Sequence, residues 1–164
     1  MGPKRLSHLD DRGRARMVDI GAKDETERVA VAAGEVTMST ETLALIRDGL
    51  LKKGDVITVA EIAGVMAAKH TSELIPLCHN VAVEQVEVTL SIDEGLPGIK
   101  IIAKARTHGK TGVEMEALTA VSIAAVTVVD MVKSVEKKWM VGNIRLIEKH
   151  GGKSGDLYPW GNPL

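Results

Sequence analysis

The chain has 164 residues, of which 45% are hydrophobic and 26% charged, the composition of an ordinary globular domain rather than of a disordered chain. Lys and Arg total 21 against 22 Asp and Glu, so no overall basic field favours binding to nucleic acid or to an anionic membrane. Aromatic residues make up only 2% of the chain, too few for a protein that stacks single-stranded bases.

A single cysteine, Cys78, excludes an internal disulfide and any multi-cysteine zinc or iron–sulfur site. The longest uncharged apolar-rich stretch, residues 117–129, is shorter than the roughly 20 residues that a membrane span needs. No apolar segment follows the basic residues near the N-terminus, as a secretory signal would require. We therefore expect a cytoplasmic protein with no metal site and with neither a membrane nor a nucleic acid as partner.

Composition divides the chain into three segments. Residues 1–28 carry 13 charged side chains of mixed sign and few apolar ones, which predicts a mobile N-terminal arm. Residues 151–164 are rich in Gly and Pro and predict a loose C-terminal tail. Residues 29–150 between them are expected to form a single catalytic domain.

Hydrophobic periodicity begins this domain with a strand over residues 29–38, in which Gly34 marks a bulge. Ser39 or Thr40 can cap a short helix after it, and Asp55 can cap a second, longer helix.

Alternating apolar residues predict further strands at 81–92, 99–106 and 143–149, with a turn at 94–98. The long apolar run at 113–135 predicts a helix between the last two strands. The resulting order, βαββαβ, is typical of an α+β ferredoxin-like fold, an antiparallel sheet with its helices packed on one face.

Two segments, Gly109-Lys110-Thr111 and Gly152-Lys153-Ser154, look at first like phosphate-binding loops. A P-loop has another Gly five positions before the Gly-Lys pair, where this chain has Lys104 and Ile147. Each segment is therefore either a solvated turn or an anion contact made through backbone N–H groups and an ammonium.

Cys78 and His79 are adjacent, between Pro76 and a predicted strand. Neighbouring side chains on an extended segment point to opposite faces, which disfavours a thiol–imidazole nucleophile pair. We expect a structural role for Cys78 and a polar contact or proton donation for His79.

The predicted long helix carries charges where an apolar helix does not need them. Glu114 and Glu116 lie in its first turn, where acids also complement the helix dipole. Asp130 interrupts a run of valines near the other end, where the dipole favours cations. An i,i+3 ion pair with Lys133 is the simple explanation, but an acid inside an apolar stripe is also a candidate for proton transfer. Lys53, beside a Gly turn, either solvates a loop or holds phosphate.

Together these residues resemble the cyclic pyranopterin monophosphate synthase family, molybdenum cofactor biosynthesis protein C. The resemblance runs from about residue 6 to residue 156. The segments that carry it are Met17-Val18-Asp19, Lys53-Gly54-Asp55, Leu74-Ile75-Pro76-Leu77-Cys78-His79, residues 109–119, Asp130-Met131-x-Lys133 and residues 151–156. Asn80 departs from the family, which usually has Pro after the Cys-His pair.

The resemblance implies a lyase that converts 3',8-cyclo-7,8-dihydroguanosine 5'-triphosphate into cyclic pyranopterin monophosphate and pyrophosphate. It implies Asp130 as general acid/base, with Lys53 and Lys133 contacting phosphate and assisting proton transfer. The residues that it implies for substrate binding are Leu77, Cys78, His79, Glu114, Met115 and Glu116. No redox cofactor is implied, and whether Mg²⁺ accompanies the triphosphate is left open.

The resemblance implies a homohexamer, a trimer of dimers, and the spacing of the acids favours a site shared between copies. Glu114 and Asp130 are 16 residues apart, which is about 24 Å along a continuous helix. A ferredoxin-like regulatory module that binds a ligand without catalysis is the alternative, and a structural module that only self-associates is a further one.

Overall fold

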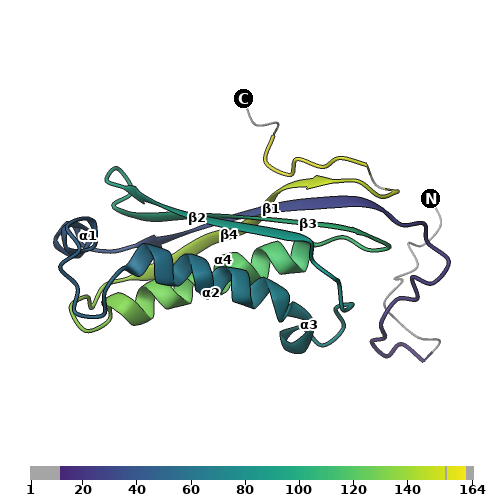
Figure 1. The fold of residues 1–164 in the computed structure, drawn as a ribbon, viewed down its shortest axis with the longest axis horizontal. Coiled ribbons are helices and arrows are strands. Elements are labelled where there is room, and N and C mark those ends of the chain that lie inside the picture. Colours follow the sequence, from purple (N-terminus) through teal and green to yellow (C-terminus); the bar gives the residue numbers. More distant parts are fainter. Residues whose placement is uncertain (1–11, 154, 162–164) are drawn as a thin grey trace.

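Four strands form one antiparallel sheet with the order β2-β3-β1-β4, and the helices lie on one face of it (Figure 1). This computed structural model describes residues 12–153 and 155–161. The strands are β1 (Thr26–Thr37), β2 (Gln85–Asp93), β3 (Gly98–Gly109) and β4 (Met140–His150). The element order and the one-sided helix layer confirm the predicted ferredoxin-like α+β fold.

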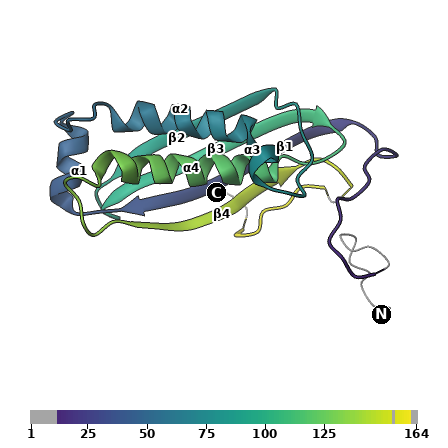
Figure 2. The same cartoon turned by 90° about the horizontal axis from the view of Figure 1, so that it is seen from below.

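Four helices are described: α1 (Thr40–Arg47), α2 (Val56–Lys69), α3 (Thr71–Leu74) and α4 (Glu114–Val132). Seen from below, α2 and α4 lie side by side on the sheet, with α1 at one end of this pair and α3 at the other (Figure 2). Ser39 caps α1 by accepting a hydrogen bond from Thr42 N at 3.3 Å, and Asp55 caps α2 by accepting one from Thr58 N at 3.1 Å. Both caps agree with the sequence-based prediction.

The core lies between the sheet and the pair α2 and α4. Small residues on β1 let α4 approach closely, since a Cβ at Gly34 would lie 2.6 Å from Val121 Cγ1. The predicted irregularity is also present, because the register between β1 and β4 shifts between Ala33 and Glu35. By length and composition α4 could cross a membrane, but more than half of its apolar window is buried inside the protein, as in a core helix.

The start of β2 and the helix α3 differ from the prediction. β2 begins at Gln85 rather than at residue 81, because Thr107 donates its hydroxyl to Ala82 O at 2.7 Å and Glu84 N donates to Arg106 O at 3.0 Å. These hydrogen bonds satisfy the backbone groups of Ala82 and Glu84 without a regular strand pairing. The short helix α3 was not predicted, because four residues carry no readable period.

Both end segments include ordered contacts with the domain. β1 begins at Thr26, inside the segment expected to be an arm, and Leu157 forms a β-bridge with Lys149. The Trp160 indole donates to Leu146 O at 2.9 Å. Residues 1–11 of the expected arm and residues 162–164 of the expected tail lie outside the described residues.

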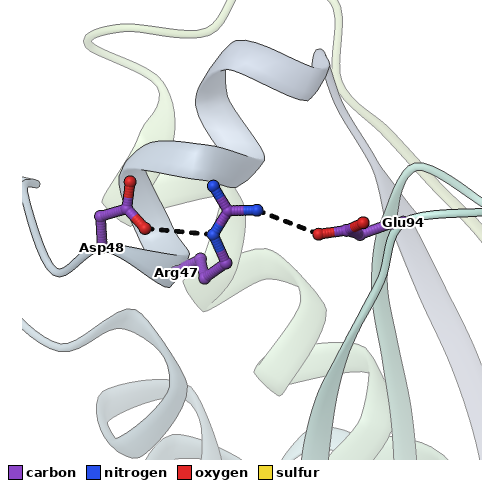
Figure 3. Close-up of polar contacts among 3 residues, drawn as sticks. All are labelled: Arg47, Asp48 and Glu94. Carbon is purple, nitrogen blue, oxygen red and sulfur yellow. Dashed lines mark hydrogen bonds and ion pairs between the residues drawn. The ribbon is translucent and has the colours of Figure 1, made fainter.

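Helix α1 is tied to the β2–β3 hairpin by exposed ion pairs. Arg47 lies between Asp48, at 3.1 Å, and Glu94 of the hairpin, at 3.0 Å (Figure 3). All three side chains are at least half exposed, so these pairs add little stability.

Candidate functional site

Lys53, Asp130 and Lys133 meet at the end of α4. Asp130 lies in the last turn of this helix, Lys133 is its C-cap, and Lys53 comes from the turn between α1 and α2. Lys53 Nζ is 2.6 Å from Asp130 Oδ2 and 2.8 Å from the Asp130 carbonyl oxygen. Lys133 Nζ is 2.6 Å from Asp130 Oδ1. The i,i+3 pair is therefore present, and a second lysine from a distant segment joins it.

Two cations control the charge of this carboxylate. Hydrogen bonds, first from Lys133 and then from Lys53, lower the pKa of Asp130 to about 2. Asp130 is therefore ionised at neutral pH, while the three side chains stay between 42% and 60% exposed in the single chain. The group presents two ammonium ions around one carboxylate, with a net positive charge that can face an anion.

The opposite end of α4 holds the two glutamates of its first turn. Glu114 pairs with Lys149 of β4 at 2.5 Å. Glu116 is 2% exposed, and its Oε2 is buried without a hydrogen-bond partner among the described residues. Burial, with a smaller contribution from the charge of Glu114, raises the pKa of Glu116. Glu116 can therefore hold a proton at higher pH than an exposed carboxyl group does.

Cys78 and His79 approach this end of α4 from the loop after α3. The Cys78 thiol lies 3.9 Å from Glu116 Oε1, and burial followed by the nearby Glu116 raises the pKa of the thiol. This favours the neutral thiol over a nucleophilic thiolate. His79 Nε2 donates to the Val18 carbonyl oxygen at 2.7 Å, which leaves Nδ1 as an acceptor if the ring is neutral.

A cavity of about 640 Å³ opens beside these residues. Five of the six residues expected to bind substrate are found here, since Leu77, Cys78, His79, Glu114 and Met115 line it. Glu116, the sixth, lies behind this wall in contact with Cys78.

A second cavity, of about 420 Å³, adjoins the first and has five cations among its lining residues. The two share Glu114 and Lys149 on their walls. The cationic residues of this basic cleft are Lys23, Arg28, Lys110, Lys149 and Lys153. Five cations against Asp24 and Glu114 make it suited to an anion with several charges.

Comparison with known proteins identifies the family of this chain. Residues 17–152 match the MoaC family. The chain belongs to the MoaC family. It is 57% identical over 152 residues to proteins named cyclic pyranopterin monophosphate synthase from Brucella ovis, Brucella melitensis and Brucella abortus, covering 93% of this chain and 92% of each relative.

Sequence reasoning on this MoaC chain missed three cations of the basic cleft. Lys23, Arg28 and Lys149 come from the N-terminal segment, β1 and β4, so no local spacing connects them. The two Gly-Lys segments were the available signal, since Lys110 and Lys153 both line the cleft. Ser154 of the second segment lies outside the described residues. Within the residues that the structure describes, no three His, Cys, Asp or Glu side chains are grouped to hold a metal ion.

Gly151 directly follows β4 and precedes Gly152, which lines the basic cleft. Its φ is +88°, and a Cβ there would lie 2.1 Å from the Glu27 carbonyl oxygen, a rigid backbone atom. Its neighbour Gly152 lies against the Arg28 guanidinium. Only glycine fits Gly151 without a shift of β1 or β4.

We expect Gly151→Ala to reduce the free energy of unfolding by about 1–3 kcal/mol, because it combines a left-handed conformation with a backbone clash. Gly155→Ala is the matched control, since Gly155 also has a positive φ, of +63°, but has no atom within 4 Å of a Cβ. Chemical denaturation of both variants measures the difference. Equal losses of unfolding free energy in the two variants would show that the clash with the Glu27 carbonyl does not contribute.

The MoaC chain does not bring its two candidate groups together. The Lys53–Asp130–Lys133 group and the cavity with Glu114 lie at opposite ends of α4, and the helix is continuous between them (Figure 1). The 16 residues from Glu114 to Asp130 span about 24 Å of helix. One chain therefore holds these two groups apart, at the two ends of α4.

Proposed function

We propose that this chain converts 3',8-cyclo-7,8-dihydroguanosine 5'-triphosphate into cyclic pyranopterin monophosphate and pyrophosphate, as a lyase of molybdenum cofactor biosynthesis. The observation that carries the proposal is an Asp130 carboxylate held between two lysine ammonium groups in a chain of the MoaC family. Relatives with 57% identity that are named cyclic pyranopterin monophosphate synthase support it.

The basic cleft suits the triphosphate of this substrate. Fixed ammonium and guanidinium groups stabilise the negative charge of phosphate oxygens and of a departing pyrophosphate. Arg28 and Lys149 project from strands β1 and β4, so the sheet fixes their backbones before an anion binds. The cavity with Cys78, His79 and Met115 has room beside it for the ring system.

Asp130 is proposed to act with its two lysines in the proton transfers of the rearrangement. A carboxylate whose pKa is about 2 is a poor acid at neutral pH. A carboxylate of this pKa is also a weak base, so it takes part in the proton transfers by orienting Lys53 and Lys133. Either lysine can donate a proton or contact phosphate. Glu116, with its raised pKa, is the better proton donor among the carboxyl groups.

The chemistry needs no redox group, because it is a rearrangement with elimination of pyrophosphate. Mg²⁺, if it takes part, would arrive with the triphosphate. We propose a cytoplasmic homohexamer, a trimer of dimers, as the family resemblance implies. A second copy would place the start of one α4 beside the end of another.

Turnover of the cyclic triphosphate tests the function directly. Purified protein is mixed with this substrate, and pyrophosphate and the cyclic monophosphate are measured together. Release of both in equal amounts is expected. Binding without turnover would favour the ferredoxin-like regulatory module, and the absence of both would favour a purely structural module.

Lys53→Ala and Lys133→Ala are each expected to lower substrate affinity or turnover by about ten- to hundredfold, because each removes a charged hydrogen-bond donor. Pyrophosphate should compete for the same site. Lys52→Ala is the control, since it removes the adjacent lysine of the same turn. Calorimetry and steady-state kinetics measure both quantities. Unchanged values in both lysine variants would assign Lys53 and Lys133 to solvated ion pairs.

A further inference from the structure

Glu136 is a buried carboxylate in the turn that follows α4. It is 5% exposed and accepts four hydrogen bonds. Its Oε2 accepts from the Ser39 amide at 2.8 Å and from the Ser39 hydroxyl at 2.7 Å. Its Oε1 accepts from the amides of Lys137 and Lys138, both at 2.7 Å. Among the described residues no Lys or Arg forms an ion pair with it, so this carboxylate is held by hydrogen bonds.

These bonds join two segments that are 97 residues apart. Ser39 is the N-cap of α1, and α1 leads through the buried Leu51 into the turn that carries Lys53. On the other side, Glu136 N donates to Val132 O at 2.9 Å, which attaches the carboxylate to the last turn of α4. Glu136 therefore connects the segment that carries Lys53 with the helix end that carries Asp130.

The ion pairs of the Lys53–Asp130–Lys133 group cannot fix this geometry by themselves. The three side chains are 42–60% exposed, and exposed ion pairs contribute little free energy. Packing is also incomplete, because a cavity of about 260 Å³ lies between the Lys53 turn and the end of α4, lined in part by Leu51 and Met131. A buried anchor with four hydrogen bonds is the stronger constraint.

We propose that Glu136 is a positioning residue that holds α1 and the Lys53 turn against the end of α4, and so sets the placement of Lys53 on Asp130. This rests on the proposed role of Asp130 and its lysines. Hydrogen bonds, first from Ser39, lower the pKa of Glu136 to about 2, so the anchor stays ionised across the neutral range. The sequence alone does not indicate this role of Glu136, because an acid next to two lysines in a turn resembles an ordinary solvated charge.

The test compares Glu136→Gln with Arg47→Ala. Gln keeps the size of the side chain but places an amide donor among four donors, whereas Arg47→Ala removes only the exposed ties of α1 shown in Figure 3. We expect Glu136→Gln to lower kcat about ten- to hundredfold with little change in KM, because misplacement of a reacting group affects the chemical step. Arg47→Ala should leave kcat near that of the wild type.

A second readout does not depend on turnover. Loosening Lys53 removes one of the two hydrogen bonds that lower the pKa of Asp130, so a carbon-13 titration of its carboxyl group should move upward in Glu136→Gln and stay unchanged in Arg47→Ala. Ser39→Ala removes one hydroxyl donor and provides a milder variant if Glu136→Gln does not fold. It should move both readouts in the same direction by less.

Unchanged kcat and an unchanged Asp130 titration in a folded Glu136→Gln or Ser39→Ala protein would overturn the positioning role. Failure of the proposed function has a different signature. In that case the wild type would not turn over the cyclic triphosphate, while the titration of Asp130 would still respond to Glu136→Gln.

Discussion

Replacement of Asp130 by Asn is expected to reduce turnover by at least about a hundredfold, the contribution typical of a group that moves protons in the transition state. The neutral amide cannot hold both ammonium groups, and it places an N–H group against one of the two lysines. The side chain is about half exposed, so the fold should survive and the unfolding temperature should change little. Single-turnover release of pyrophosphate measures the loss.

Asp48→Asn is the matched control for this variant. Asp48 is also half exposed and paired with a cation, Arg47, but it lies on the surface at the end of α1. It should retain wild-type turnover. Pyrophosphate release by Asp130→Asn within a few-fold of the wild type would show that the carboxylate has no part in the reaction.

The pH profile gives an independent check on Asp130. Its pKa is lowered to about 2 in the folded chain, so the interactions that hold the carboxylate are present above the ordinary pKa of Asp and are lost as the pH falls toward 2. The wild type should therefore show no acidic limb in the neutral range from this group. Loss of Lys133, the larger cause of the shift, should move the titration upward.

The order of elements could be predicted from sequence because this fold follows local rules closely. Valines at alternate positions indicated β1, and isoleucines and alanines that alternate with basic residues indicated β3. The caps at Ser39 and Asp55 could be predicted from residue type alone. The start of β2 could not be predicted, since residues 81–84 keep the alternation of a strand. In the structure, Ala82 O instead accepts from the Thr107 hydroxyl, and Glu84 N donates to Arg106 O.

The candidate site also has residues that the local sequence predicts and residues that it does not. Asp130 could be singled out because a charge inside an apolar helix is a local anomaly, and the pair with Lys133 follows from helical spacing. Lys53 is 77 residues from Asp130, so only the family resemblance placed it in the group. The basic cleft and Glu136 depend on contacts between distant segments, for which a single sequence carries no period or spacing.

Mixing two inactive proteins, Glu114→Ala and Asp130→Ala, is expected to restore activity if the site is shared between copies. In one chain the two acids lie at opposite ends of the unbroken helix α4, about 24 Å apart. A compactly bound nucleotide cannot contact both from the same copy. Two copies related by a two-fold axis, with α4 of one antiparallel to α4 of the other, would place the start of each helix beside the end of its partner and form two equivalent sites.

Under conditions that exchange subunits, the mixture should therefore regain activity. With random pairing, a site is intact when one chain supplies Glu114 and the other supplies Asp130, so about one quarter of the wild-type activity is expected. Mixing Glu114→Ala with the double variant Glu114→Ala/Asp130→Ala is the control, because no intact site can form in that mixture. Mass spectrometry of isotope-labelled chains measures the exchange. If both variants are folded, exchange is complete and no activity returns, then each site belongs to one chain and the shared arrangement is wrong.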